Sequence, residues 1–324
     1  MSRILSGIQP SGQLHIGNYM GMMKPMIELQ SKHELFCFIV NYHALTTIQN
    51  GEKLRKNTIS AALDFLALGI DPDKCYFWVQ SDIHEVVELS WILSCNTSLG
   101  LLERSHSYKD KIAKGIVPNC GLFCYPVLMA ADILLFQAEM IPVGKDQKQH
   151  IEMTRDIAQR FNSTYGETFV LPEPLISDDI AIIPGIDGLK MSKSYDNAIY
   201  IFESEKDLKK KVMRIVTDST PVEDPKDPDR CTVFQLYKLF ADRDRAEKLR
   251  GRYQNGGVGY GDVKKELFGL MWDYFRPYRE KRDMLSKDTG EIYQILQRGA
   301  EKTKEIARKN IEEVKHKIGL SYKS

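Results

Sequence analysis

Short apolar runs alternate with longer segments of helical periodicity through the first half of this chain. Four of these runs predict strands: residues 3–9, 35–45, 74–81 and 138–144. Residues 35–45 are rich in β-branched and aromatic side chains, which is typical of a buried strand. Residues 51–70 and 85–104 lie between these runs and carry apolar side chains at helical spacing, with a stop predicted at Gly69. The alternation predicts an α/β fold with a Rossmann-like parallel sheet wrapped by helices.

The pattern changes near residue 200. Residues 204–216 predict an amphipathic basic helix, residues 221–230 form a loop rich in Pro and Asp, and only helices are expected after it. Apolar side chains in residues 263–285 fall on one helical stripe, which we interpret as core: Leu267, Met271, Tyr274, Phe275 and Tyr278. The sequence therefore predicts a sheet domain over residues 1–200 and an all-helical domain, with a C-terminal helix, over residues 201–324.

Composition narrows the expected partners and location. The 324 residues are 43% hydrophobic and 27% charged with a net charge of +1, so any binding of nucleic acid or membrane must be local. The longest apolar run, residues 125–136, is too short to span a bilayer and contains Asp132. The start of the sequence has no signal-peptide pattern, so we expect a cytoplasmic protein. Cys120 and Cys124 are spaced to face each other on a helix, but the cysteines form no C-x-x-C zinc pattern.

Residues 10–21, PSGQLHIGNYMG, fall at a predicted strand-to-helix turn. The first N–H groups of a helix have no partner within it and the helix dipole adds positive potential, so an anion is favoured there. Gly12 and Gly17 would let the backbone approach the anion closely, while His15 and Asn18 would donate hydrogen bonds. Taken alone, the stretch is better explained as a surface loop that carries a histidine, so a second signal is needed for an anion site.

A second signal lies in residues 188–194, GLKMSKS, which follow the apolar run IAIIPG. Lys190 and Lys193 are close enough in sequence to converge on one polyanion, with Met191 as an apolar anchor. Ser192 and Ser194 would add hydroxyl donors. A K-x-x-K pattern by itself carries almost no information, and its value comes from its pairing with the turn at residues 10–18.

Together these two segments resemble the H-I-G-H and K-M-S-K-S signatures of class I aminoacyl-tRNA synthetases, here as HIGN and KMSKS. The stretches YPVLMAADILLF, IPVGKDQKQHIEMTRDIAQRF and VTDS are similar to those of the tryptophanyl-tRNA synthetase family. The resemblance runs from Leu5 to about Ser219, and more weakly to the C-terminus. Many relatives differ at Leu5, at Asn41-Tyr42 and at Lys145, which affects details of the pocket.

The resemblance implies that the protein binds ATP with Mg²⁺, joins its α-phosphorus to the carboxylate of L-tryptophan, and passes tryptophan to the 3′ end of tRNA(Trp). Lys190, Lys193, His15 and Gln9 would be the catalytic groups, and Lys190 to Ser194 would embrace the triphosphate. The family's ATP site corresponds to Gln9, Pro10, Ser11, His15, Gly17, Asn18, Gly144, Lys145, Asp146, Gln147, Ile183, Lys190, Met191, Ser192, Lys193 and Ser194.

Asp132 is the candidate for amino-acid choice, because a carboxylate within LMAADILLF is costly to bury without a partner such as an indole N–H. Such a pocket would reject phenylalanine strongly without an editing domain. An exposed position on an amphipathic helix is the alternative for Asp132. Leu5, His43, Met129 and Val143 would line the indole or be plain core, Tyr125 and Gln147 would hold the ammonium group, and His150 would orient its helix.

The resemblance also implies that the helical part after residue 200 reads the anticodon and that two copies pair near residues 105–175, with tRNA crossing between them. Lys209, Lys210, Lys211 and Arg214 would form a phosphate patch. Three alternatives remain open: the related tyrosine enzyme, a non-catalytic sensor of tryptophan or nucleotide, and a small-molecule nucleotidyltransferase. KMSKS and the AADILL context argue against the tyrosine enzyme, and the intact lysines argue against a sensor.

Overall fold

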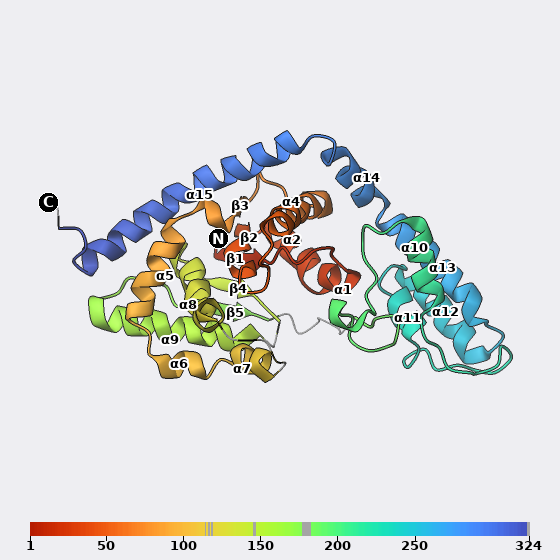
Figure 1. The fold of residues 1–324 in the computed structure, drawn as a ribbon. Coiled ribbons are helices and arrows are strands. Elements are labelled where there is room, and N and C mark those ends of the chain that lie inside the picture. The colour runs from red at the N-terminus through yellow and green to blue at the C-terminus, as the bar shows by residue number, and fades with distance from the viewer. Residues whose placement is uncertain (114, 116, 118, 145–146, 177–182, 323–324) are drawn as a thin grey trace. The chain divides into compact units, whose positions relative to one another are not determined.

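A five-stranded parallel sheet forms the centre of the first part of the chain (Figure 1). The computed structural model describes residues 1–113, 115, 117, 119–144, 147–176 and 183–322. Strand order is β3-β2-β1-β4-β5. The strands are β1 (Arg3–Ile8), β2 (Glu34–Ile39), β3 (Tyr76–Val79), β4 (Met140–Pro142) and β5 (Glu173–Leu175). The order reverses at β1, which lies between β2 and β4, so the predicted Rossmann-like parallel sheet is confirmed.

The chain folds into two compact units. The sheet unit comprises Met1–Gly12, Met26–Ser177 and Asp288–Ser324, and the helical unit comprises Gln13–Pro25 and Asp178–Lys287. This division differs from the sequence-based boundary at residue 200 in three places. The described residues 183–200, which the sequence assigned to the sheet domain, belong to the helical unit. The turn at residues 13–25 belongs to the helical unit, and the C-terminal helix belongs to the sheet unit.

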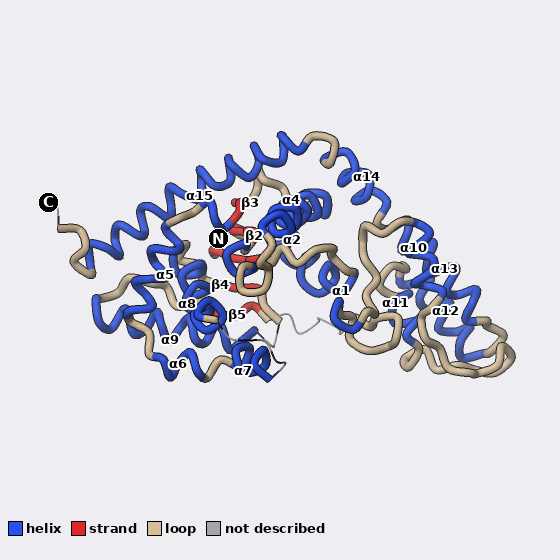
Figure 2. The backbone as a smooth tube through the Cα atoms, viewed as in Figure 1, coloured by secondary structure: helices blue, strands red, loops and turns tan. Residues whose placement is uncertain are grey.

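Helices cover the sheet of the first unit, and Figure 2 shows its strands in red between them. The core gathers large apolar side chains from strands and helices, among them Phe36, Trp78 and Phe136, each at most 1% exposed. Helices α5 and α9 pack against α8. The helices of this unit are α3 (Asn41–Ala44), α4 (Gly51–Leu68), α5 (Glu85–Cys95), α6 (Leu99–Glu103), α7 (His106–Ala113), α8 (Cys120–Leu135), α9 (Lys148–Tyr165) and α15 (Thr289–Lys317), with a 3₁₀ turn at Gln80–Asp82.

The long C-terminal helix α15 packs on β3, α5, α4 and α8, and Figure 1 draws it in blue along this side of the unit. A glycine makes the close approach possible: a Cβ atom added at Gly299 would lie 1.8 Å from the carbonyl oxygen of Phe77. Further along the helix, Asn310 Nδ2 donates to the carbonyl of Leu135 at 2.7 Å. The lysine-rich end of the chain therefore carries an apolar face that belongs to the sheet unit.

The helical unit is built from α1 (Ile16–Asn18), a π-helical turn (Tyr19–Met23), a 3₁₀ turn (Lys193–Tyr195), α10 (Glu205–Met213), α11 (Thr232–Tyr237), α12 (Arg243–Asn255), α13 (Tyr260–Tyr274) and α14 (Arg276–Leu285). Helix α2 (Lys24–Leu29) spans the boundary between the units. Leu267, Met271 and Phe275 of the predicted apolar stripe are buried, and α13 packs against α10 and α11.

Three predicted elements are shorter than the sequence pattern suggested. The strand expected over residues 35–45 ends at Ile39, and residues 41–44 form α3 instead. The helix expected over residues 85–104 breaks at residues 96–98, where Asn, Thr and Ser replace apolar side chains. The stripe at residues 263–285 is split into α13 and α14, because Pro277 supplies no N–H and favours the first turn of a new helix. Among the described residues, no helix has the length and apolar character needed to cross a membrane.

Candidate active site

His15 closes the turn that follows residues 10–14. Its Nδ1 accepts the backbone N–H of Asn18 at 3.1 Å, and Asn18 Oδ1 accepts the backbone N–H of His15 at 3.3 Å. This reciprocal pair is a capping box, with histidine and asparagine in the places where serine and glutamate are usual. The predicted strand-to-helix turn is present, and its two signature polar side chains hold each other in place.

Burial and the nearby charge of Lys193 lower the pKa of His15 from 6.5 to about 4. The imidazole is therefore neutral at physiological pH. Because Nδ1 accepts a hydrogen bond, the proton of the neutral ring resides on Nε2. His15 can thus donate from Nε2 to an anion without carrying a charge of its own.

The two signature segments meet within the helical unit. The backbone N–H of Ile16 donates to the carbonyl of Ile199 at 2.9 Å, and the N–H of Gly17 points at Met191 Sδ at 3.4 Å. A Cβ atom at Gly17 would lie 3.0 Å from His15 Nδ1 and 3.5 Å from Met191 Cβ. The glycine therefore leaves room for the His15 ring, while Met191 would be in ordinary contact with an added Cβ. Met191 is buried, as expected of the predicted apolar anchor.

Asn197 organises the KMSKS loop, a role that the sequence did not predict. This side chain is 1% exposed; its Oδ1 accepts the N–H of Ser192 at 2.8 Å. Its Nδ2 donates to Asp187 Oδ1 at 2.8 Å and to the carbonyl of Lys190 at 3.1 Å. The signal for it was local: an asparagine a few residues after a Gly- and Ser-rich loop can saturate the loop's backbone groups.

The loop leaves its polar groups accessible. Lys190 is exposed and Lys193 is half-buried, while Ser192 Oγ lies 2.8 Å from Ser194 Oγ. The backbone of Met191 is tied to Ile183 by an N–H to carbonyl bond of 2.9 Å. Ile183, Met191 and the cations thus share one loop in the helical unit.

The remaining residues assigned to ATP lie at carboxyl ends of strands in the sheet unit. Gln9, Pro10 and Ser11 follow β1, and Gly144 follows β4. These are the two strands at which the strand order reverses, the usual ligand position of an open parallel sheet. Lys145 and Asp146 lie outside the described residues.

Asp132 is buried at 2% exposure on α8, so the exposed alternative is wrong. Its Oδ2 lies 2.9 Å from His43 Nε2, while Gln80 Nε2 donates to Oδ1 at 2.9 Å and to Oδ2 at 2.8 Å. Burial raises the pKa of the Asp132 carboxyl, and its bonds to His43 and Gln80 oppose that shift. The carboxylate is therefore held by one side chain from α3, which follows β2, and one from the 3₁₀ turn that follows β3.

Gln80 was not recognised in the sequence, although it directly follows the predicted strand that ends at Val79. It is fully buried, and its Oε1 accepts the N–H of Tyr42 at 3.0 Å. This bond fixes the amide so that its NH₂ faces Asp132. Its role could have been suspected from the sequence, because an uncharged polar side chain directly follows the carboxyl end of a buried strand.

Tyr125 lies about two helical turns before Asp132 on α8. Its hydroxyl bonds to His150 Nε2 and lies 3.4 Å from Ser105 Oγ, and its ring packs edge-on against His43 at 6.4 Å. His150 on α9 therefore positions Tyr125. From the sequence we expected His150 only to orient its own helix. The other residues assigned to the tryptophan pocket also belong to the sheet unit: Leu5 on β1, Met129 on α8, Val143 after β4 and Gln147 before α9.

The basic patch expected on residues 209–214 contains fewer available side chains than the sequence suggests. The ammonium group of Lys211 bonds to Glu203 and to the carbonyl of Ala198 and lies 4.3 Å from the centre of the Tyr200 ring. Lys211 is thus engaged within the unit. Lys209, Lys210 and Arg214 stay exposed.

A parallel sheet with its order reversed at β1, and a helical unit in which HIGN and KMSKS touch, define a class I aminoacyl-tRNA synthetase. Comparison with known proteins agrees: the family model of tRNA synthetases class I (W and Y) matches residues 1–275.

The relatives specify the branch. The chain is 54% identical to a tryptophan–tRNA ligase of Campylobacter jejuni over 98% of this chain and 100% of that protein. It is 53% identical to a tryptophan–tRNA ligase of Fusobacterium nucleatum, over 99% and 98% of the two chains. The crystal structure of the C. jejuni tryptophanyl-tRNA synthetase complexed with ADP and tryptophan superimposes with a TM-score of 0.94, at 53% identity over 98% of this chain and 99% of that one. The chain belongs to the tryptophanyl-tRNA synthetases, and the resemblance in its motifs is confirmed.

Proposed function

We propose that this synthetase activates L-tryptophan with ATP and then charges tRNA(Trp), with the residue roles given below. A carboxylate oxygen of tryptophan attacks the α-phosphorus of ATP, the bond from that phosphorus to the bridging oxygen breaks, and pyrophosphate leaves. A ribose hydroxyl at the 3′ end of the tRNA then attacks the carbonyl carbon and releases AMP. The observation that carries the proposal is the buried Asp132 carboxylate, oriented by His43 and Gln80.

The HIGN and KMSKS segments would stabilise the phosphates. Activation is an in-line displacement, so the enzyme mostly positions the reactants and neutralises the charge that develops on pyrophosphate. Lys190 and Lys193 would supply positive charge, and neutral His15 would donate from Nε2. Mg²⁺ would arrive on the phosphate oxygens as part of the substrate, since this ion usually enters nucleotide sites in that way.

Other residues would bind ATP along its length. Gln9 would orient the reacting α-phosphate, a position consistent with its place after β1. The further ATP contacts that we propose are Pro10, Ser11, Gly17, Asn18, Gly144, Lys145, Asp146, Gln147, Ile183, Met191, Ser192 and Ser194.

Asp132 would accept the indole N–H of tryptophan. Its carboxylate is already fixed by three hydrogen bonds, so little side-chain freedom is lost when the substrate binds. Phenylalanine has no N–H and would leave this site without its donor, which is the kind of mismatch that supports discrimination of about 10⁴ to 10⁵. Leu5, His43, Met129 and Val143 would line the ring, and Tyr125 and Gln147 would hold the ammonium group.

The helical unit would bind tRNA. The protein would act in the cytoplasm, where ATP and tRNA are supplied, and its working form would be a homodimer. Support for self-association comes from apolar side chains exposed on the sheet unit. Trp91 on α5 is 72% exposed and Val87, one turn away, is 47% exposed, while Val117 lies within the segment proposed to pair. Sedimentation velocity of wild type and Trp91→Glu over a range of concentrations would test the dimer and the part that this face plays in it.

Exchange of pyrophosphate into ATP tests the first step without tRNA. We expect exchange with tryptophan and none with tyrosine or phenylalanine. Exchange with tyrosine would overturn the role of Asp132, and no exchange with any amino acid would favour the sensor alternative. Transfer of labelled tryptophan to tRNA(Trp) then tests the second step.

A further inference from the structure

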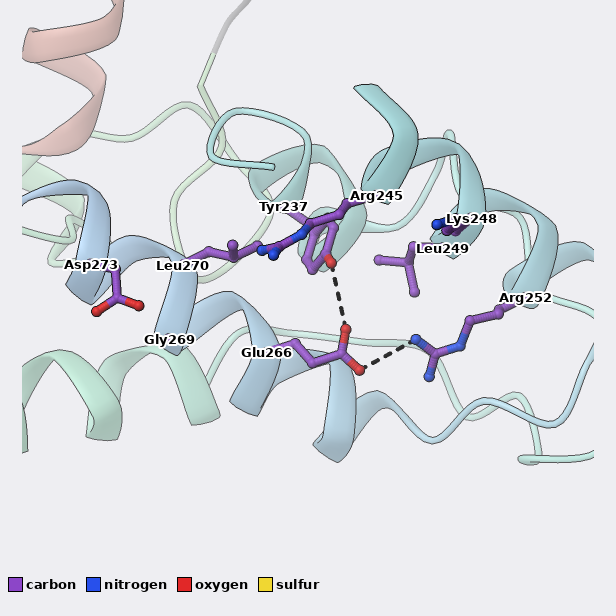
Figure 3. Close-up of a pocket in the computed structure, with 9 residues that line it drawn as sticks. All are labelled: Tyr237, Arg245, Lys248, Leu249, Arg252, Glu266, Gly269, Leu270 and Asp273. Atoms are coloured by element: carbon purple, nitrogen blue, oxygen red, sulfur yellow. Dashed lines mark hydrogen bonds and ion pairs between the residues drawn. The ribbon is translucent and has the colours of Figure 1, made fainter. Parts of the chain in front are cut away.

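A groove of about 430 Å³ runs between α12 and α13 in the helical unit (Figure 3). Its two walls carry opposite charge. Arg245, Lys248 and Arg252 stand one to two turns apart on α12, while Glu266 and Asp273 stand on α13. A groove with this division of charge does not favour a simple anion, because the carboxylates would repel it.

Glu266 is the fixed polar group of this groove. Its Oε1 accepts from Arg252 Nη1 at 3.3 Å, and its Oε2 accepts from the Tyr237 hydroxyl at 3.5 Å, as the dashed lines of Figure 3 show. Tyr237 is buried, so its hydroxyl is a stationary donor. Both carboxylate oxygens are oriented, and each keeps a lone pair for a further donor.

The floor of the groove is apolar and open. Leu249 and Leu270 line it beside Gly269. A Cβ atom added at Gly269 would meet no other atom within 4 Å, so the helix backbone itself forms part of the floor. A flat ring can therefore lie against this floor while its edge faces Glu266.

We propose that this groove binds one nucleotide of a single-stranded RNA segment, with Glu266 accepting the exocyclic amino group of a cytosine or adenine. Arg245 and Lys248 contact the adjacent phosphate, and the leucines pack against the base. A carboxylate beside cations recognises a donor edge next to a negative charge, which is the chemistry of a nucleotide. An acidic peptide would match the cations but not Glu266 and Asp273.

The inference rests on the proposed charging of tRNA and specifies where the unpaired bases are read. The codon UGG pairs with the anticodon CCA, in which every base carries an exocyclic amino group. Replacement of a cytosine by uracil exchanges that amino donor for a carbonyl acceptor, which Glu266 would repel. The geometry therefore makes Glu266 a specificity-determining residue.

The experiment pairs Glu266→Gln with tRNA(Trp) transcripts that carry uracil in place of each anticodon cytosine in turn. With the wild-type enzyme, kcat/KM for charging should fall about 10- to 100-fold on one of these transcripts. With Glu266→Gln the loss on that transcript should shrink to about 3-fold or less, because the amide can donate to the uracil carbonyl. An equal loss with both enzymes on every transcript would overturn the assignment of Glu266.

Two glycine variants test the groove without removing a polar group. Gly269→Leu places a side chain on the floor and should lower kcat/KM for tRNA about 10-fold or more. Gly261→Leu is the matched control: it lies on the same helix, its added Cβ also meets no atom within 4 Å, and it does not line the groove. If both variants charge tRNA like wild type, the groove is not the RNA site.

Pyrophosphate exchange separates this inference from the proposed function. All three variants should exchange pyrophosphate at the wild-type rate with tryptophan, since none of them lies in the proposed ATP or tryptophan site. Wild-type enzyme that charges tRNA, together with variants that do so equally well, would overturn the groove alone. Wild-type enzyme that neither exchanges nor charges would overturn the proposed function.

Discussion

His43 Nε2 lies 2.9 Å from Asp132 Oδ2, although the two residues are 89 positions apart in the chain. Gln80 completes the arrangement with a bond to each carboxylate oxygen. A buried carboxylate must be paired, and here the segments that follow two neighbouring strands supply the partners. Specificity for tryptophan would thus depend on a group that is oriented before the substrate arrives.

Asp132→Asn should lower kcat/KM for tryptophan in pyrophosphate exchange by about 10² to 10³. The asparagine keeps the size of the side chain but loses its charge, and its NH₂ cannot accept the indole N–H. KM for ATP should change by less than about 2-fold. Asp156→Asn, at an exposed position of α9, is the control. Unchanged kcat/KM for tryptophan would remove Asp132 from the proposed indole site.

Lys193→Ala should lower kcat of pyrophosphate exchange by about 10² to 10³ and leave the Kd of tryptophan nearly unchanged. The reason is that a cation facing pyrophosphate stabilises charge that develops only in the transition state. Equilibrium binding of tryptophan and steady-state exchange would be measured on the same preparation. Lys206→Ala, on the exposed side of α10, should behave as wild type. Equal losses in kcat and tryptophan affinity would contradict a transition-state role.

Stability should depend on pH through His15. Its pKa is about 4 in the folded protein and about 6.5 when unfolded, so the unfolded chain binds more protons between these values. The contribution is fully present above about pH 6.5 and is lost as the pH falls toward 4, at a cost of up to about 3 kcal/mol.

Replacement of His15 tests that dependence. His15→Asn keeps an oxygen that can cap the helix but does not titrate, so urea midpoints measured from pH 7.5 to 4.5 should fall less steeply than in wild type. His316→Asn, an exposed histidine of α15, should leave the slope unchanged. The same slope in wild type and His15→Asn would show that another group is responsible.

Asn197→Ala should destabilise the KMSKS loop by about 3 kcal/mol, because the three hydrogen bonds of a buried side chain are lost. KM for ATP should rise as the loop loses its shape. Urea unfolding and pyrophosphate exchange would both be measured, with Asn255→Ala at an exposed helix end as the control. Wild-type behaviour in both assays would mean that the loop is held by other contacts.

Gly299→Ala should destabilise the sheet unit by about 2 to 4 kcal/mol, since a Cβ atom would lie 1.8 Å from the Phe77 carbonyl and force α15 away from β3. Gly251→Ala is the same substitution in α12, where an added Cβ meets no atom within 4 Å, and it should have the opposite effect. We expect it to stabilise the protein by up to about 1 kcal/mol. Thermal unfolding of both variants checks the sign as well as the size. A neutral Gly299→Ala would contradict the packing of α15 on the sheet.

Local sequence determined the elements and most of the chemistry-bearing segments. Apolar runs bounded by polar residues define β1, β2 and β3, and Gly69 ends α4 in a left-handed conformation, as its position in the sequence predicts. HIGN and KMSKS were recognisable because the two segments together resemble the signatures of class I aminoacyl-tRNA synthetases, whereas each segment alone carried little information. Asp132 was recognisable because a carboxylate in an apolar helix is costly to bury.

Tertiary structure decided the partners of those segments. Nothing near Asp132 in the sequence points to His43 and Gln80, which reach it only because the ends of parallel strands share one edge of the sheet. Likewise, the sequence predicts a C-terminal helix but not its place on β3, where Gly299 lies opposite the Phe77 carbonyl. Periodicity is a property of neighbours along the chain, whereas packing and hydrogen-bond pairing depend on groups that folding brings together from distant positions.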